Sequence, residues 1–188
     1  MSPAYAVQVM EIRPGSAADA AEIRQVRRET WIAAYAGIID RAAIDRATAE
    51  PPPGRPAPAP PPDVRTLVAV GGDDPAVVGF ASFGPERAVV SARYPAIPQA
   101  SGLTALPGEL YALYVAPAWW STGTGRALMG SVLTALTEAG YPRVVLWVLA
   151  DNARARRFYE RAGFAPDGAT NILTGLGGLL ELRYARDL

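Results

Sequence analysis

The spacing of apolar residues along the chain first predicts a set of β-strands. Near-alternation over residues 7–13 predicts a strand that ends at Pro14-Gly15. Two short apolar runs on either side of Gly71-Gly72-Asp73-Asp74 predict a hairpin. Residues 144–149 are continuously apolar, which is typical of a strand buried on both faces. The expected strands are 7–13, 67–70, 77–83, 109–115, 144–149, a short strand at Phe164, and 181–185.

Helical periodicity and capping residues predict two helices near the start of the chain. Ser16 and Asp19 have the spacing of a capping box, before a helix expected to stop near Gly37. Asp40 is expected to cap a second, short helix over residues 41–49.

Two further helices are predicted in the second half. Residues 123–139 form an amphipathic helix. Its apolar stripe consists of Leu128, Val132 and Leu136. Asp151 or Asn152 is expected to cap a last helix that ends near Gly163. The elements predict an α/β domain of six or seven strands, with a strand–helix–strand–helix unit over residues 109–163.

Length and segment composition favour a single domain over residues 1–188 with two long connections. Residues 51–62 (PPPGRPAPAPPP) cannot form a helix and are interpreted as an extended or polyproline-like spacer. A partner-docking ligand is the alternative for this segment. Residues 84–108 form a proline-punctuated loop of a length that often serves function.

Composition removes several kinds of chemistry. The chain has no cysteine and no histidine, which excludes a thiol nucleophile, a Ser-His-Asp triad and the usual zinc ligands, so we expect no metal. Eighteen acidic residues balance eighteen basic ones, so no global field attracts nucleic acid or an anionic membrane. No apolar run approaches a membrane span, and residues 1–15 do not resemble a signal peptide. We expect a cytoplasmic protein without nucleic-acid or membrane partners.

A glycine turn at residues 120–125 (WSTGTG) follows a predicted strand and opens a predicted helix. Gly123 and Gly125 let an anion approach the backbone, and the free amides of the first helical turn favour a diphosphate there. A dinucleotide fingerprint would need a third glycine at Leu128, and a Walker A loop would need a lysine, which the chain lacks. A helix-opening turn without a ligand is the plain alternative for this motif taken alone.

A second motif follows the buried strand, at residues 152–164 (NARARRFYERAGF). Together the two motifs resemble the GNAT superfamily of N-acetyltransferases, whose members carry (Gln/Arg)-x-x-Gly-x-(Gly/Ala) and then Asn-x-x-Ala-x-x-Phe-Tyr-x-x-x-Gly-Phe. The resemblance implies a mixed, mostly antiparallel sheet flanked by helices. Trp120 departs from the family pattern, because it stands where Gln or Arg is usual. This departure implies either some loss of affinity for the cofactor or a tryptophan ring that stacks on the cofactor.

The resemblance also implies acetyl-CoA as cosubstrate. The amides of residues 121–126 would hold its pyrophosphate, the backbone of Leu113 and Val115 its pantetheine arm, and Asn152 an amide of that arm, beside its N-cap role. An arginine such as Arg154 would meet the 3′-phosphate. The implied cofactor-binding residues are Leu113, Tyr114, Val115, Trp120, Ser121, Thr122, Gly123, Thr124, Gly125, Arg126, Asn152, Arg154 and Tyr159.

Two residues are the catalytic candidates. The resemblance places a general acid for the departing thiolate at Tyr159, whose alternative role is a core aromatic. It also places a catalytic glutamate at Glu109 in certain members. The absence of histidine and cysteine favours such a carboxylate as base. A surface glutamate at a strand end is the alternative for Glu109, and water or an acid such as Glu86 would then serve.

The expected activity is acetyl transfer to a primary amine by direct attack in a ternary complex. A non-catalytic acyl-CoA sensor is the alternative, and an interaction module built on the proline tract is a third hypothesis. The acceptor, a small molecule or a peptide, is left open, as is a homodimer. Trp31 and Tyr35 share a helix face and either line the acceptor pocket or pack in the core.

Overall fold

The computed structural model describes residues 10–50, 61–73, 75–87 and 106–188. Most of the proline tract and of the 84–108 connection therefore lies outside the described residues, as do the first positions of the strand expected at 7–13. The predictions for these segments stay predictions.

One seven-stranded sheet runs through the molecule in the order β1-β2-β3-β4-β5-β7-β6. Every neighbouring pair is antiparallel except β4 and β5, which are parallel. The prediction of a mixed, mostly antiparallel sheet is confirmed. The strands are β1 Met10–Pro14, β2 Arg65–Gly71, β3 Ala76–Pro85, β4 Gly108–Val115, β5 Arg143–Leu149, β6 Ala165–Leu173 and β7 Leu179–Asp187.

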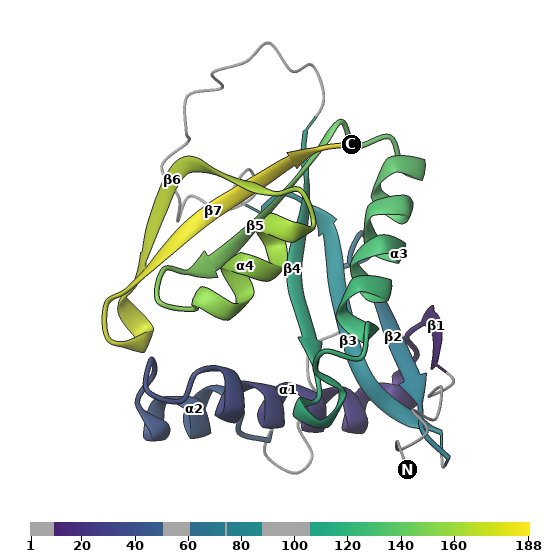
Figure 1. Ribbon diagram of the computed structural model, residues 1–188, viewed down its shortest axis with the longest axis horizontal. Coiled ribbons are helices and arrows are strands. Elements are labelled where there is room, and N and C mark those ends of the chain that lie inside the picture. Colours follow the sequence, from purple (N-terminus) through teal and green to yellow (C-terminus); the bar gives the residue numbers. More distant parts are fainter. Residues whose placement is uncertain (1–9, 51–60, 74, 88–105) are drawn as a thin grey trace, which may run out of the picture.

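Helices cover the sheet from two sides. In Figure 1, α3 and α4 lie in front of the sheet, whereas α1 and α2 run across its lower end. The helices are α1 Ala20–Ala34, α2 Arg41–Ala47, α3 Thr124–Glu138 and α4 Ala153–Arg161, with short 3-10 turns at Ala17–Asp19, Pro117–Trp119 and Thr174–Leu176. None of the described helices is long and apolar enough to span a bilayer.

The predicted caps of α2 and α4 form. The Asp40 carboxylate accepts hydrogen bonds from the amides of Ala42 and Ala43 at 3.0 and 3.2 Å. The Asn152 side chain accepts one from the amide of Ala155 at 3.0 Å, so Asn152 rather than Asp151 is the cap. Each bond satisfies donors that the first helical turn leaves unpaired.

The main core lies between α3 and the sheet. The predicted stripe of α3 is confirmed, because Leu128, Val132 and Leu136 are fully buried. They pack with residues of β4, β5 and β7 in one apolar cluster. Burial of such side chains contributes about 1.5–3 kcal/mol each. This packing fixes α3, and therefore the turn that precedes it, against the middle of the sheet.

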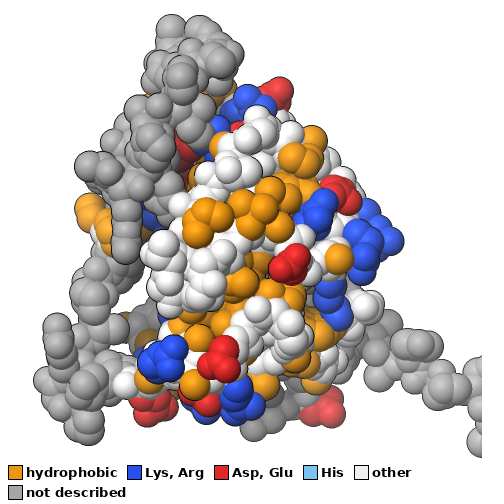
Figure 2. Space-filling model, turned by 90° about the vertical axis from the view of Figure 1, so that its left-hand side faces the viewer, with side chains coloured by type: hydrophobic (Ala, Val, Ile, Leu, Met, Phe, Trp, Pro, Cys, Tyr) orange, Lys and Arg blue, Asp and Glu red, His pale blue; other side chains and the backbone are white. Residues whose placement is uncertain are grey.

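The last hairpin is longer than the sequence predicts. Strands at Phe164 and 181–185 were expected, but β6 and β7 each have nine residues. β6 contains Pro166 and Gly168 and lies at the sheet edge, where it has one neighbour and little apolar periodicity. Its Ile172 and the opposing Leu180 are exposed large hydrophobic residues. Apolar side chains gather on this side of the molecule (Figure 2).

The two central strands separate after a short pairing. β4 and β5 pair only over Gly108–Leu110 and Val144–Leu146, and then diverge toward α1 (Figure 1). On the other side of β4, Ser82 pairs with Ala112 but Phe83 pairs with Leu110, which leaves Tyr111 as an extra residue. Such a bulge bends a strand and increases its twist. The bend opens the sheet between β4 and β5.

A buried carboxylate holds the entry to α1. The Asp19 side chain accepts hydrogen bonds from Arg13 at 2.7 and 2.9 Å, and from the Ser16 amide at 2.7 Å, as a capping box requires. The Arg13 guanidinium and the Ser16 donors lower the pKa of Asp19 well below its usual range. This network connects β1 to the start of α1.

We expect Asp19→Asn to lower the free energy of unfolding at pH 7 by about 1–3 kcal/mol, because hydrogen bonds to the charged group are lost. A carboxylate whose pKa is lowered by folding stabilises the native state above its unfolded pKa, near 3.9, and loses that contribution as pH falls. The difference from wild type, measured by urea unfolding, should therefore shrink below about pH 4. Asp45→Asn, at an exposed ion pair, is the control and should change little. A difference that persists unchanged at pH 3 would contradict the ion-pair explanation.

Candidate active site

A cavity of about 890 Å³ occupies the opening between β4 and β5. It is lined by the residues of both strands that no longer pair with each other, at 111–115 and 147–149. Its size is in the range of small-ligand pockets. The opening of the sheet therefore creates the site.

Two groups of residues contribute to this cavity. The glycine turn at residues 120–126 and the facing residues of α4 contribute Ser121, Gly123, Gly125, Arg126, Asn152, Arg154, Phe158 and Tyr159. The aromatic wall is formed by α1, the segment after it and the end of the β6–β7 hairpin, and it contributes Trp31, Tyr35, Ile39, Leu173 and Leu176. The cavity therefore combines a polar part at the glycine turn with an apolar wall.

The glycine turn has a backbone that suits an anion. Gly123 is the N-cap of α3 with φ +100°, and Ser121 has φ +65°, which is uncommon for a residue with a side chain. Thr122 holds the turn, since its hydroxyl donates to the Trp119 carbonyl at 2.8 Å. The first amides of α3 have no partner within the helix and lie at its positive end. The turn predicted from sequence thus forms where an anion would be stabilised.

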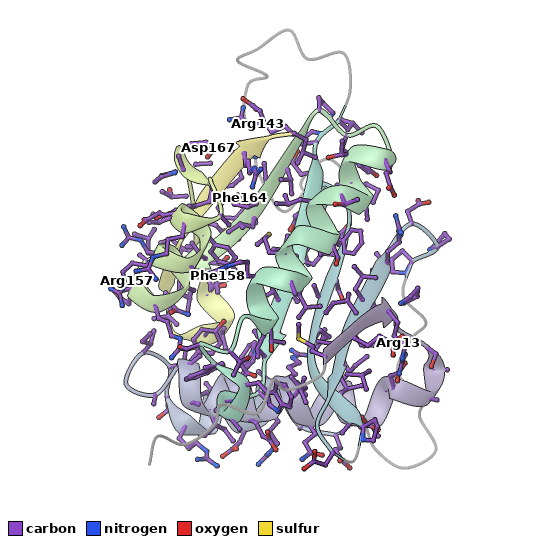
Figure 3. The ribbon with its side chains drawn as sticks, turned by 45° about the vertical axis from the view of Figure 1, so that its right-hand side comes forward. Arg13, Arg143, Arg157, Phe158, Phe164 and Asp167 are labelled. Atoms are coloured by element: carbon purple, nitrogen blue, oxygen red, sulfur yellow. The ribbon has the colours of Figure 1, made fainter. Side chains whose placement is uncertain are left out.

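Gly125 lies where α3 and α4 come close. A Cβ atom at this position would lie 3.4 Å from the Phe158 ring. Phe158 points from α4 toward α3, whereas Arg157 points away from that helix (Figure 3). A side chain larger than methyl at Gly125 would therefore enter the passage between the two helices.

Trp120, the departure from the family pattern, is used inside the protein. Its indole N–H donates to the Val115 carbonyl at 2.7 Å, and the Thr30 hydroxyl donates to the same oxygen at 3.0 Å. The Arg154 guanidinium lies 3.8 Å from the centre of the Trp120 ring, which is a cation–π contact. Trp120 thus anchors the end of β4 and holds a positive charge beside the glycine turn.

The backbone of β4 presents groups to the cavity at alternate positions. The Ala116 amide donates to the Val78 carbonyl, so the hydrogen-bonding alternation directs the backbone of Tyr114 toward β3 and that of Leu113 and Val115 toward the opening. Because the Val115 carbonyl already accepts two bonds, its amide and the backbone of Leu113 remain for a ligand. Tyr114 lines the cavity without offering its backbone.

Tyr159 lines the cavity from α4, with its ring against Phe158 and Phe164 at centroid distances of 5.4 and 6.1 Å. Burial, together with the nearby Tyr114, raises the pKa of Tyr159 far above its usual range. The phenol therefore keeps its proton and is a hydrogen-bond donor. Tyr159 therefore both packs in the core and lines the cavity, and its role in catalysis stays a prediction.

Glu109 has a different environment from either one that the sequence predicts. It is 1% exposed, so it is not a surface glutamate, and it does not line the cavity. Its carboxylate accepts hydrogen bonds from the amide of Arg87 at 2.8 Å and from the Nε of Arg87 at 3.0 Å. The Arg87 guanidinium also lies 4.4 Å from the Tyr111 ring centre. The base role of Glu109 stays a prediction, and this ion pair weighs against it.

A carboxylate that sequence reasoning missed does line the cavity. Glu181 lies on β7, and its Oε2 accepts a hydrogen bond from Asn171 of β6 at 3.1 Å. Burial raises the pKa of Glu181, although Asn171 and Arg87 act in the opposite direction. Glu86, the other acid considered, is buried and paired with Arg183 at 2.7 Å. Glu181 follows two leucines at the start of β7, but the same strand also carries Arg183, Arg186 and Asp187, so no pattern in the sequence singles Glu181 out.

No group of three or more acidic residues in the described ranges is arranged to hold a metal ion.

Comparison with known proteins identifies relatives over this same region. A family model described as "Acetyltransferase (GNAT) family" matches residues 24–164. A mycothiol acetyltransferase of Beutenbergia cavernae is 36% identical over 93 residues, which cover 50% of this chain and 30% of that protein. An uncharacterized N-acetyltransferase of Mycobacterium tuberculosis is 40% identical over 67 residues, 36% of this chain and 43% of that protein. The chain thus spans less than half the length of each of these curated relatives.

Solved structures agree in fold. The PaiA N-acetyltransferase of Thermoplasma acidophilum, determined in complex with coenzyme A, has a TM-score of 0.67 at 19% identity, over 96% of this chain and 99% of that one. A nourseothricin acetyltransferase has a TM-score of 0.62 at 24% identity, over 95% and 98%. With a family model that matches most of the chain, and with this sheet and turn in place, the chain belongs to the acetyltransferase (GNAT) family.

Proposed function

We propose that the protein is an acetyl-CoA-dependent N-acetyltransferase that transfers an acetyl group to a primary amine by direct attack in a ternary complex. The observation that carries this proposal is the opening between β4 and β5, whose cavity is lined by the glycine turn, α4 and an apolar wall. A diphosphate joined to a long amide-bearing arm suits this combination better than a nucleotide alone.

The residues around the opening suit each part of acetyl-CoA. The free amides of the glycine turn hold the pyrophosphate, and Arg154, which lies over the Trp120 ring, adds a positive charge beside the pyrophosphate. The backbone of Leu113 and the amide of Val115 pair with the pantetheine arm, which takes the place of a strand between β4 and β5. Asn152 lines the cavity and accepts from an amide of its own helix, so its side-chain NH₂ is oriented for the same arm.

The chemistry needs an oriented amine, a stabilised oxyanion and an assisted leaving group. Backbone N–H groups of the opened strand stabilise the negative charge on the thioester oxygen. Tyr159 donates a hydrogen bond to the departing sulfur. Because the pKa of this phenol is raised above that of a thiol, complete proton transfer from it is uphill, and hydrogen bonding is its contribution.

A non-catalytic acyl-CoA sensor is the alternative function. It would need the turn and the opened strands, but not a buried phenol or a carboxylate that lines the cavity. Several curated relatives are named mycothiol acetyltransferases, so an acceptor of that kind belongs in the panel of amines to be tested.

The cofactor assignment predicts stabilisation by acetyl-CoA. A ligand that binds only the native state at 100 times its Kd adds about 2.7 kcal/mol to the free energy of unfolding. For a chain of this size, this corresponds to a rise in Tm of about 5–10 °C. NAD and ATP at the same concentration are the controls and should cause little shift. An unchanged Tm at millimolar acetyl-CoA would remove the basis of the proposal.

Gly125→Val should weaken CoA binding at least about tenfold, since the new side chain enters the passage beside Phe158. Gly130→Val, on the same helix, is the matched control, because nothing lies within 4 Å of its Cβ position. Isothermal titration with CoA measures both. Equal affinities in the two variants would place the phosphates elsewhere.

Tyr159→Phe should lower kcat by about 10- to 100-fold while CoA affinity changes less than about twofold, because the lost hydroxyl acts mainly as the thiolate departs. With the pKa of Tyr159 raised far above 10, the wild-type rate should show no loss from tyrosine ionisation up to about pH 10. Tyr141→Phe, at a tyrosine outside the cavity, is the control. Thiol release measures turnover, and a wild-type kcat in the Tyr159 variant would leave this residue with packing alone.

A further inference from the structure

Glu181 differs from the neighbouring acids in what holds it. Glu109 and Glu86 are each buried and bound by an arginine guanidinium. Glu181 has a neutral partner, the Asn171 side chain, which lies opposite it across β6 and β7. It also lines the cavity, which Glu109 and Glu86 do not. Of these three acids, Glu181 is therefore the one that faces the cavity.

The aromatic wall stands beside this carboxylate. Glu181 pairs across the sheet with Leu149, a member of the apolar cluster that contains Trp31, Tyr35 and Leu173. The rings of Trp31 and Tyr35 pack edge to face at 5.2 Å. A negative charge at the border of an apolar surface is suited to a molecule with an ammonium group at one end and an apolar body.

We propose that Glu181 binds the ammonium group of the acceptor and acts as the general base, and that the aromatic wall selects primary amines with an apolar, uncharged body. This inference rests on the proposed acetyltransferase function and assigns its acceptor site. Asn171 orients the carboxylate through its hydrogen bond to Oε2 and is a positioning residue.

The proton and electron movements balance in this arrangement. One proton of the acceptor ammonium moves to a Glu181 oxygen and then to water. The nitrogen lone pair forms the bond to the thioester carbonyl carbon, and the C–S bond breaks with its electron pair on sulfur. The second nitrogen proton ends on the sulfur, whose charge Tyr159 stabilises by its hydrogen bond. The products are an N-acetyl amine, the CoA thiol and one released proton.

The groups around Glu181 set the pH range of this step. Asn171 faces Glu181 from β6. Arg87, which follows β3, lowers the pKa of Glu181, and Glu109 of β4 raises it. Arg183 lies on the same strand as Glu181 and is paired with Glu86 and Asp167. The pKa of Tyr35, the residue that follows α1, is raised by burial and then by charges that include Tyr159 and Glu181, so Tyr35 lies near both of them. Burial is the largest influence and raises the pKa of Glu181. The carboxylate is then protonated, and inactive as a base, at a higher pH than an ordinary glutamate.

The charges also disfavour one class of acceptor. Arg87, which lines the cavity, is already paired with Glu109. Glu181, Glu109 and Arg87 together leave one net negative charge at this part of the site, whereas the other four arginines that line the cavity lie on α3 and α4. An acceptor that carries its own carboxylate, such as an amino acid, would be repelled, whereas an arylalkylamine would be attracted.

The decisive variant is Glu181→Gln, which keeps the shape of the side chain and removes its charge. With 2-phenylethylamine as acceptor, we expect kcat/KM near pH 7 to fall about 100-fold or more, and the defect to shrink as the pH approaches the pKa of the amine. The acid limb that Glu181 sets in the wild-type profile should be replaced by a rise that follows deprotonation of the amine itself. Glu138→Gln, at an exposed end of α3, is the control and should keep wild-type rates. An unchanged pH profile in Glu181→Gln would overturn the assignment.

Binding separates this inference from the proposed function. Calorimetric titration of 2-phenylethylamine into the CoA-saturated protein should give binding that weakens at least about tenfold in Glu181→Gln, while CoA affinity is unchanged. Glu181-dependent binding without turnover would support the acceptor site and refute the transferase. Absence of binding in the wild type would overturn the site itself.

The acceptor class is tested with three amines in the wild type. 2-Phenylethylamine should exceed ethanolamine in kcat/KM by about tenfold or more, because the aromatic wall buries its ring. Phenylalanine has the same ring with an added carboxylate and should fall well below 2-phenylethylamine. Equal kcat/KM for all three amines would refute selection by the aromatic wall and by charge.

Discussion

Parallel strands β4 and β5 remain hydrogen-bonded for three positions and then part, and the rest of the site depends on that separation. A strand inside a sheet normally satisfies its backbone groups on both sides. Beyond Leu110, the groups of β4 that point to β5 have lost that neighbour, and the bulge at Tyr111 keeps the strand bent away. The resulting gap lies in the middle of the sheet, and the amide of Val115 and the backbone of Leu113 face it, while the Val115 carbonyl is held by Thr30 and Trp120.

The elements around the opening each limit its shape. α3 is fixed by its buried stripe, and its N-terminal turn therefore has a fixed position beside the end of β4. The carbonyl of Val115 is bound by Thr30 from α1 and by Trp120 from the turn, which connects both sides of the sheet at one atom. Trp120 therefore replaces a polar family residue without leaving a void, since its indole N–H and its ring both have partners.

Acidic side chains near the opening fall into two kinds. Those bound by arginine, Glu86 and Glu109, contribute to structure, because loss of the arginine would leave a buried carboxylate uncompensated. Glu181 has a neutral partner, and burial raises its pKa, which is the direction that favours a general base. The distinction depends on which side of a strand each carboxylate occupies and on what reaches it from neighbouring strands.

The sequence by itself determined the elements and the turn. The stripe of α3, the caps at Asp40 and Asn152, the central hairpin and the glycine motif were all predicted, because periodicity, capping and turn chemistry act between residues close in the chain. It did not determine the extent of β6, which is supported by one partner strand, nor the environments of Glu109 and Glu181. Arg87 is 22 positions from Glu109, and Asn171 is held opposite Glu181 by strand register. Contacts between strands decide which charge is neutralised and which one faces the cavity, and only the tertiary structure sets those contacts.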